Sequence, residues 1–183
     1  MLDQSIKIKA PHITESISRI RYGCVFCITG RKESVAVSLE AQNPGLKATF
    51  VSLIKWHTVN GIREVETRLL FPGYVYFKTE SSEPPDLLYI QDSVRLLETT
   101  KYSWILSGMD AWFAQWVFEN HGVIGFSRAK LINNLIEFIE GPLYDLKMKG
   151  CLKKVDRRHG SALVVLPFHN REAKMWLMYD LVE

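Results

Sequence analysis

The pattern of the last part of the chain most constrains its fold. From Ile136 to Glu183, short runs of apolar and β-branched residues alternate with turn residues such as glycine and asparagine. No helical period competes with this alternation, and closely spaced short strands are typical of small β-barrels. We therefore predict that residues 135–183 form a small five-stranded all-β barrel. Its expected strands include residues 136–139, 150–155, 162–167 and 174–178.

The part before it has a mixed pattern, and residues 21–122 are predicted to form an α+β domain, an antiparallel sheet flanked by helices. An apolar stripe over Val35–Leu39 indicates a helix that ends at Pro44-Gly45. Ser107-Gly108 begins a second helix with a wide apolar face. Asn60-Gly61 is a strong signal for a β-hairpin turn. The expected strands are residues 22–29, 48–56, 69–78 and 94–98, with a short helix at 86–91.

Two further segments lie outside these predicted domains: residues 123–134, where the pattern weakens and which are interpreted as a linker, and residues 1–20, interpreted as a flexible leader. The leader does not follow the basic, apolar and small-residue plan of a secretory signal. No apolar run approaches the roughly 20 residues that span a bilayer. The hydrophobic fraction of 47% and the charged fraction of 23% are those of a soluble globular protein. We therefore expect a cytoplasmic protein with no membrane partner.

The chain has three cysteines, Cys24, Cys27 and Cys151, and this odd number argues against a disulfide framework. The first two form a C-x-x-C pair, which occurs in redox sites and zinc sites. Here the pair lies in a predicted strand, where residues three apart point to opposite faces. No second pair of Cys or His residues supplies the remaining zinc ligands. We interpret both cysteines as buried structural residues and expect no metal.

The sequence contains no recognisable catalytic motif. Its five histidines do not pair with a nucleophile in a known pattern, and there is neither a Gly-rich phosphate loop nor a metal-binding helix. A serine–histidine–carboxylate site whose members meet only in space stays open as an alternative. We expect no enzyme activity and no cofactor.

Three motifs in a fixed order resemble those of the NusG family of bacterial transcription elongation factors. The first is Tyr22–Glu33, an aromatic and apolar strand followed by Thr-Gly and a charged helix start. The second is Leu70–Phe77, with the sequence Leu-Phe-Pro-Gly-Tyr-Val-Tyr-Phe. The third is Ile136–Leu143 with its continuation through residues 150–171, which resembles a KOW module. The resemblance implies an N-terminal NGN domain, a C-terminal KOW barrel and a factor without catalysis of its own.

The resemblance also implies how such a protein binds RNA polymerase. The N-terminal domain of the family holds the clamp helices of bacterial RNA polymerase through an apolar patch. In the predicted strand, Tyr74 and Tyr76 point to one face. If these tyrosines bind the polymerase, that face has to be exposed. On the residues alone, these tyrosines could simply cover the core. The candidate polymerase-binding residues are Phe26, Phe71, Pro72, Tyr74 and Tyr76.

A local basic cluster marks the predicted barrel, although the net charge of the chain is only +3. Loops gathered at one end of a small barrel could contact nucleic-acid phosphates, whereas a solvated charged rim is the alternative. At the start of the first helix, Arg31 and Lys32 could contact nontemplate DNA. The candidate RNA-binding residues are Lys147, Lys149, Lys153, Lys154, Arg157, Arg158, Arg171 and Lys174.

Within the family, the segments 124–127 and 174–177 are most similar to the antiterminators called LoaP, which are thought to read a hairpin in nascent RNA. We therefore expect a processive antiterminator that suppresses pausing and termination. A general housekeeping factor that couples polymerase to a ribosomal protein or a termination factor is a near alternative. A stand-alone KOW-type RNA-binding protein is another. A monomer is the expectation that the family implies.

Overall fold

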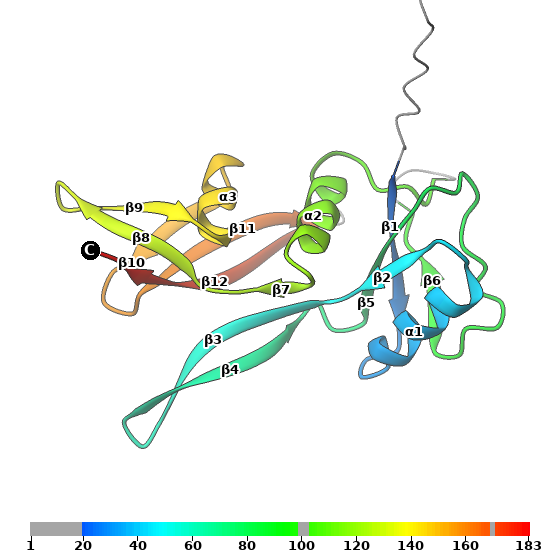
Figure 1. Ribbon diagram of the computed structural model, residues 1–183, viewed down its shortest axis with the longest axis horizontal. Coiled ribbons are helices and arrows are strands. Elements are labelled where there is room, and N and C mark those ends of the chain that lie inside the picture. The colour runs from blue at the N-terminus through cyan, green and yellow to red at the C-terminus, as the bar shows by residue number, and fades with distance from the viewer. Residues whose placement is uncertain (1–19, 99–102, 169–170) are drawn as a thin grey trace, which may run out of the picture.

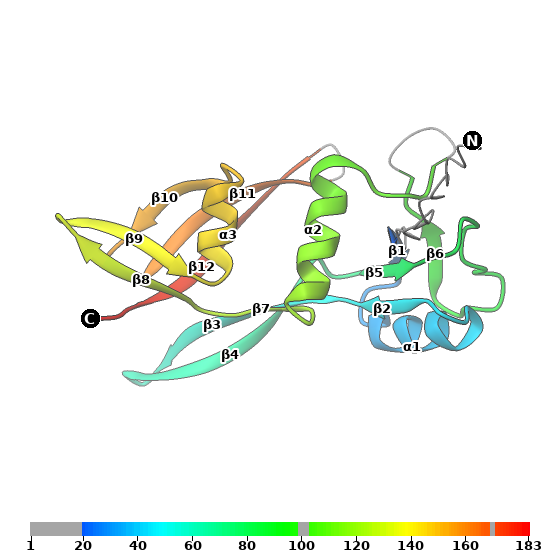
Figure 2. The same ribbon diagram turned by 45° about the horizontal axis from the view of Figure 1, so that its top comes forward.

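The computed structural model describes residues 20–98, 103–168 and 171–183, and within them the chain forms a mixed α/β fold of three helices and twelve strands (Figures 1 and 2). The predicted leader, apart from its last residue, lies outside the described residues. None of the helices in the described part of the chain is long and apolar enough to cross a membrane. The helices are α1 (Lys32–Gln42), α2 (Gly108–Glu119) and α3 (Pro142–Met148).

The first sheet has four antiparallel strands in the order β2-β5-β1-β6. Helix α1 covers one face, because its apolar stripe places Val35 and Leu39 fully inside a cluster with Val25 and Phe77. Asn43 ends the helix, since both its backbone and its side-chain amide donate to the Leu39 carbonyl. The strands are β1 (Arg21–Cys27), β2 (Lys47–Thr49), β5 (Tyr74–Thr79) and β6 (Ser93–Leu96).

A long hairpin forms the second sheet, in the order β4-β3-β7. The predicted strand 48–56 is in fact split at Phe50, so that its first part pairs in the first sheet and its second part begins the hairpin. Asn60 and Gly61 have φ angles of 51° and 81°, which fit the predicted two-residue turn of the I′ type. The strands are β3 (Val51–Val59), β4 (Ile62–Leu70) and β7 (Val123–Ile124).

The C-terminal sheet has five strands in the order β10-β11-β12-β8-β9. It differs from the predicted all-β barrel, because α3 lies between β9 and β10 in the chain and packs against the sheet. The segment 123–134, interpreted as a linker, instead contains β7 and the whole of β8. The strands are β8 (Ser127–Ile132), β9 (Leu135–Glu140), β10 (Leu152–Asp156), β11 (Ser161–Phe168) and β12 (Arg171–Leu181).

Two smaller predictions also fail for local reasons. Residues 86–91 form turns and not a helix, because the side chain of Asn43 accepts from and donates to the backbone of Asp86, and Asp86 Oδ1 accepts from the Leu88 backbone amide. The predicted strand 69–78 is interrupted by a turn at residues 71–73, where Phe71 has a φ of 53°.

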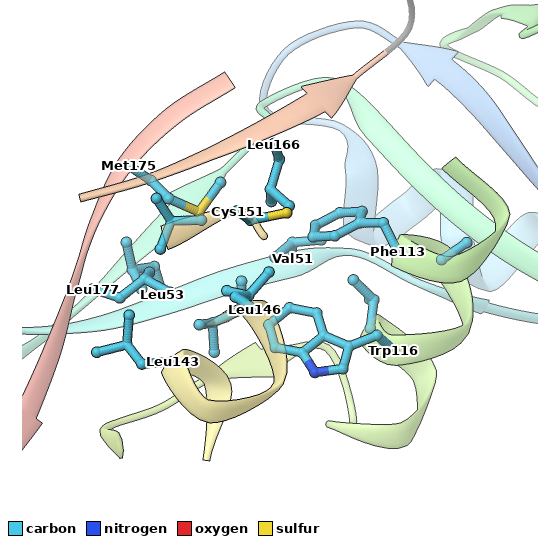
Figure 3. Close-up of a cluster of buried hydrophobic side chains, with 14 of the residues drawn as sticks. Val51, Leu53, Phe113, Trp116, Leu143, Leu146, Cys151, Leu166, Met175 and Leu177 are labelled. Atoms are coloured by element: carbon cyan, nitrogen blue, oxygen red, sulfur yellow. The ribbon is translucent and has the colours of Figure 1, made fainter. Parts of the chain in front are cut away.

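One hydrophobic core crosses the predicted boundary between the two domains (Figure 3). Val51 and Leu53 of β3 and Phe113 of α2 lie in the same cluster as buried residues of α3, β11 and β12. The indole Nε1 of Trp116 donates a hydrogen bond of 2.8 Å to Asp145 Oδ2, which ties α2 to α3. The C-terminal sheet is therefore packed on elements of the predicted N-terminal domain, residues 21–122.

Candidate functional site

The turn between β4 and β5 has a geometry that few residues can adopt. Gly73 has a φ of 88°, and a Cβ atom added there would lie 2.9 Å from the Cys27 carbonyl oxygen and 3.1 Å from the Phe26 ring. The turn lies this close to β1 because the Cys27 backbone amide donates a hydrogen bond of 2.7 Å to the Gly73 carbonyl oxygen. Glycine at this point of the Leu70–Phe77 motif is thus a steric requirement.

Four half-buried aromatic side chains meet beside this turn, and we call them the aromatic cluster: Phe26, Phe71, Tyr74 and Phe168. The Phe26 and Tyr74 rings lie 5.3 Å apart in an edge arrangement. Phe168 stacks on Phe71 at 4.4 Å and meets Tyr74 edge-on at 5.1 Å. Three of the five predicted polymerase-binding residues are therefore brought together, and a fourth, Pro72, is exposed in the adjoining turn.

Phe168 belongs to the cluster although sequence reasoning did not select it. It ends β11, in the part of the chain that was predicted to be a separate barrel. Its ring covers the face that Phe71 and Tyr74 present. No local pattern could have indicated this contact, because it depends on how the C-terminal sheet packs against the first sheet.

Tyr76 does not belong to an exposed surface, and the prediction that it does is wrong. The residue is only 1% exposed, with its ring 5.8 Å from that of Phe113 on α2. The alternation along β5 is as predicted, since Tyr76 lies in one core cluster and Val75 and Phe77 in the other. Burial is the main cause that raises the pKa of the Tyr76 hydroxyl well above its ordinary value.

A cleft of about 320 Å³ lies beside the aromatic cluster, where the start of α2 faces the end of the β11–β12 hairpin. Met109 and Asp110 contribute from α2, while Phe168, Arg171 and Glu172 contribute from the hairpin. Arg171 therefore lies at this junction and not among the other basic residues.

The candidate RNA-binding residues occupy three separate places and do not gather at one end of the sheet. Lys149 follows α3 and holds its Nζ 5.2 Å from the centre of the Trp112 ring. Arg157 lies in the β10–β11 turn and donates to the Asn134 carbonyl at 3.2 Å. Arg171 lies at the opposite end of β11, roughly 23 Å away at the usual strand rise. The others are Lys147 on α3, Lys153 and Lys154 on β10, Arg158 in the turn and Lys174 on β12, all exposed.

The two candidate DNA contacts at the start of α1 differ sharply. Arg31 is exposed, with its Nε 3.7 Å from Asp92 Oδ2. Lys32 is only 2% exposed, and its Nζ lies 4.1 Å from the centre of the Phe50 ring and 3.5 Å from Glu33 Oε1. Lys32 is therefore a packed residue that cannot reach a DNA strand in this arrangement.

Cys24 and Cys27 are buried in the structure, as predicted. All three are free and buried, and Cys24 and Cys27 lie in the clusters on opposite faces of the first sheet. Burial is the largest effect on both thiols and raises their pKa values, which disfavours the reactive thiolate. Within residues 20–98, 103–168 and 171–183, no three His, Cys, Asp or Glu side chains are grouped so that they could hold a metal ion.

Comparisons with known proteins give a structural likeness only. No protein-family model and no curated protein matches the chain. Nine chains of solved structures match it, among them a structure of Thermotoga maritima NusG described as "Domain interaction in Thermotoga maritima NusG". That similarity covers 87% of this chain and 94% of the other, with 14% sequence identity and a TM-score of 0.46. At this identity and score, the likeness does not establish a family for the chain.

Proposed function

We propose that the protein is a non-catalytic transcription elongation factor that binds bacterial RNA polymerase through the aromatic cluster. The observation that carries this proposal is the assembly of Phe26, Phe71 and Tyr74 into one half-buried apolar group at the Leu70–Phe77 motif. Aromatic residues grouped around a rigid turn are typical anchors of protein interfaces. The motif resemblance supplies the partner, namely the clamp helices of the polymerase.

The position of Phe168 adds a requirement to this proposal. Because Phe168 stacks on Phe71 and contacts Tyr74, the polymerase has to displace the end of β11 before it reaches those rings. The covered and uncovered forms are then two states of one molecule, and the polymerase binds the uncovered one. Binding across the clamp would disfavour the open, paused polymerase, so that pausing and termination decrease without chemistry from the factor.

The basic residues of the C-terminal sheet supply the proposed second contact. Lys153 and Lys154 on β10 and Arg157 and Arg158 in the next turn form two adjacent, exposed pairs, which suits contacts with the phosphates of a nascent RNA hairpin. Such an RNA contact is what a LoaP-like antiterminator needs. A housekeeping factor would instead use this sheet to dock a ribosomal protein or a termination factor.

The test is a binding measurement between the purified protein and core bacterial RNA polymerase, with the double variant Phe71→Ala/Tyr74→Ala. We expect the wild-type chain to bind and the double variant to lose at least about 2 kcal/mol of binding free energy, since two interface anchors are truncated. Tyr89→Ala is the matched control, because Tyr89 is 76% exposed and lies outside the cluster. Thermal unfolding of each variant shows that it is folded.

Two results would count against the proposal. If the wild-type chain does not bind the polymerase, the elongation-factor function is wrong and the basic strands act as a stand-alone RNA-binding module. If the control variant loses as much affinity as the double variant, the aromatic cluster is not the interface.

A further inference from the structure

The outer edge of the β3–β4 hairpin is open to a further strand. In the sheet order β4-β3-β7, β4 is an edge, and β3 is the one strand that pairs with it among the described residues. Figures 1 and 2 show the hairpin projecting from the body of the protein, with β4 along its outer side. An edge strand of nine residues presents a row of backbone amides and carbonyls that another strand can pair with.

The register shows which residues face this open edge. The Ser52 amide donates to the Gly122 carbonyl at 2.8 Å, so the backbone groups of Ser52 point away from β4. Because bonding alternates along an antiparallel pair, Leu53 and its partner Arg68 instead exchange hydrogen bonds with each other. The backbone groups of the odd-numbered β4 residues, Val65, Thr67 and Leu69, therefore point to the open edge.

The side chains of β4 are complementary to a second copy of the same strand. When two copies lie antiparallel with Thr67 opposite Thr67, Val65 faces Leu69 and Glu66 faces Arg68 on both sides of the two-fold axis. Val65 and Leu69 are 58% and 51% exposed. Arg68 donates to Glu66 at 2.9 Å within the same strand, and the side chains of Arg68 and Glu66 are still 55% and 39% exposed, so that a second copy can share this ion pair. A shift by two residues would instead place Glu66 opposite itself, so the charges select the first alignment.

One face of the hairpin also carries apolar side chains that are largely exposed. Residues paired directly across strands share a face, and this places Val65 with Trp56 and Leu69 with Ser52. Trp56 stacks on Phe126 at 4.8 Å on the same side, and neither residue belongs to the two core clusters. Joining two hairpins at β4 would bring both copies of this apolar face together in one sheet.

We propose that two copies of the chain associate through antiparallel pairing of their β4 strands, with Thr67 on the two-fold axis. The result is a continuous six-stranded sheet in the order β7-β3-β4-β4-β3-β7. This pairing departs from the monomer that the family resemblance implied. It uses neither the aromatic cluster nor the basic residues, so it stands or falls independently of polymerase binding.

Charge reversal on β4 tests the pairing. Sedimentation velocity of the full chain over a micromolar to sub-millimolar series should show a concentration-dependent dimer. Glu66→Arg or Arg68→Glu alone should weaken self-association on the order of tenfold, because like charges then face each other across the axis. An equimolar mixture of the two variants should form a heterodimer, since the arginines of one then face the glutamates of the other. Recovery of dimer formation in the mixture would show that the hairpins of both variants are folded, because misfolded hairpins could not pair.

Cysteine cross-linking tests the register. The native cysteines are buried, so Thr67→Cys adds one exposed thiol that should form a disulfide with its own copy, at the spacing of a bonded strand pair. Val65→Cys is the matched control, because its two copies are offset by roughly 13 Å along the strands and should not cross-link. A monomer at every concentration would overturn the proposal. So would charge variants that dimerise like the wild type, or equal cross-linking at both positions.

Discussion

At the scale of single residues, Tyr76 has a buried hydroxyl that makes no hydrogen bond to the described residues. The residue is 1% exposed, and its oxygen has no hydrogen-bond partner among the described residues. A buried polar group without a partner costs about 1–3 kcal/mol. Tyr76→Phe keeps the ring contact with Phe113 and removes this cost, so we expect the free energy of unfolding to rise by about 1 kcal/mol.

Urea unfolding of the wild type and the variant measures this difference. Phe77→Ala on the same strand is the contrast, because it empties a fully buried ring position and should lower the free energy of unfolding by about 3–5 kcal/mol. A loss of stability in Tyr76→Phe would mean that the hydroxyl is bonded in solution and would contradict the expectation.

The same residue shows what the sequence can and cannot predict at this scale. The alternation of Tyr76 with Val75 and Phe77 follows from strand geometry and was predictable. Its exposure was not, because the face it shares with Tyr74 is covered by Phe113 from a helix more than thirty positions later in the chain. Lys32 was misjudged for the same reason, since Phe50, which lies between β2 and β3, covers it.

At the scale of elements, α3 depends on its neighbours for stability. A helix of seven residues is too short to be stable alone, so its stability comes from the burial of Leu143 and Leu146 and from the bond between Asp145 and the Trp116 indole. Asp145→Ala leaves that buried N–H without its acceptor and should lower the free energy of unfolding by about 1–3 kcal/mol.

Chemical denaturation checks this expectation, with Tyr144→Ala as the control on the same helix. Tyr144 is 42% exposed, and its loss should change stability by less than about 0.5 kcal/mol. If the two variants were equally stable, the bond between α2 and α3 would contribute nothing to the fold.

Elements with strong local signals were predictable, and those without them were missed. Helices α1 and α2 have an apolar period and residues that end the helix, and the hairpin turn has an Asn-Gly pair. Strand β8 was interpreted as linker because its buried positions hold Ser127 and Ala129, which are too small to register as an apolar pattern. For α3 a signal existed, since Pro142 follows Gly141 at the first helical position.

At the scale of the whole molecule, the sequence suggested two domains joined by a linker, and the structure shows a core shared between them, with the aromatic cluster covered at its margin. Whether two units pack together depends on surfaces far apart in the chain, and local patterns carry no information about that. The proposed polymerase contact was therefore predictable in most of its residues, whereas the residue that covers it was not.

Phe168 covers two of the rings that are proposed to bind the polymerase. Phe168→Ala removes the ring that stacks on Phe71 and meets Tyr74, and aromatic pairs of this kind contribute roughly 0.5–1.5 kcal/mol each. If only the uncovered form binds, the apparent affinity equals the intrinsic affinity multiplied by the fraction of molecules in the uncovered form. Loss of both contacts should therefore increase the affinity for core RNA polymerase, on the order of tenfold.

Titration of the polymerase with labelled protein measures this affinity, with Trp176→Ala on the same sheet as control, because Trp176 is exposed and distant from the cluster in the β11–β12 register. A decrease in affinity for Phe168→Ala would have a different meaning. It would show that Phe168 is itself part of the binding surface, so that the polymerase recognises the packed arrangement of Phe71, Tyr74 and Phe168 and has no need to open it.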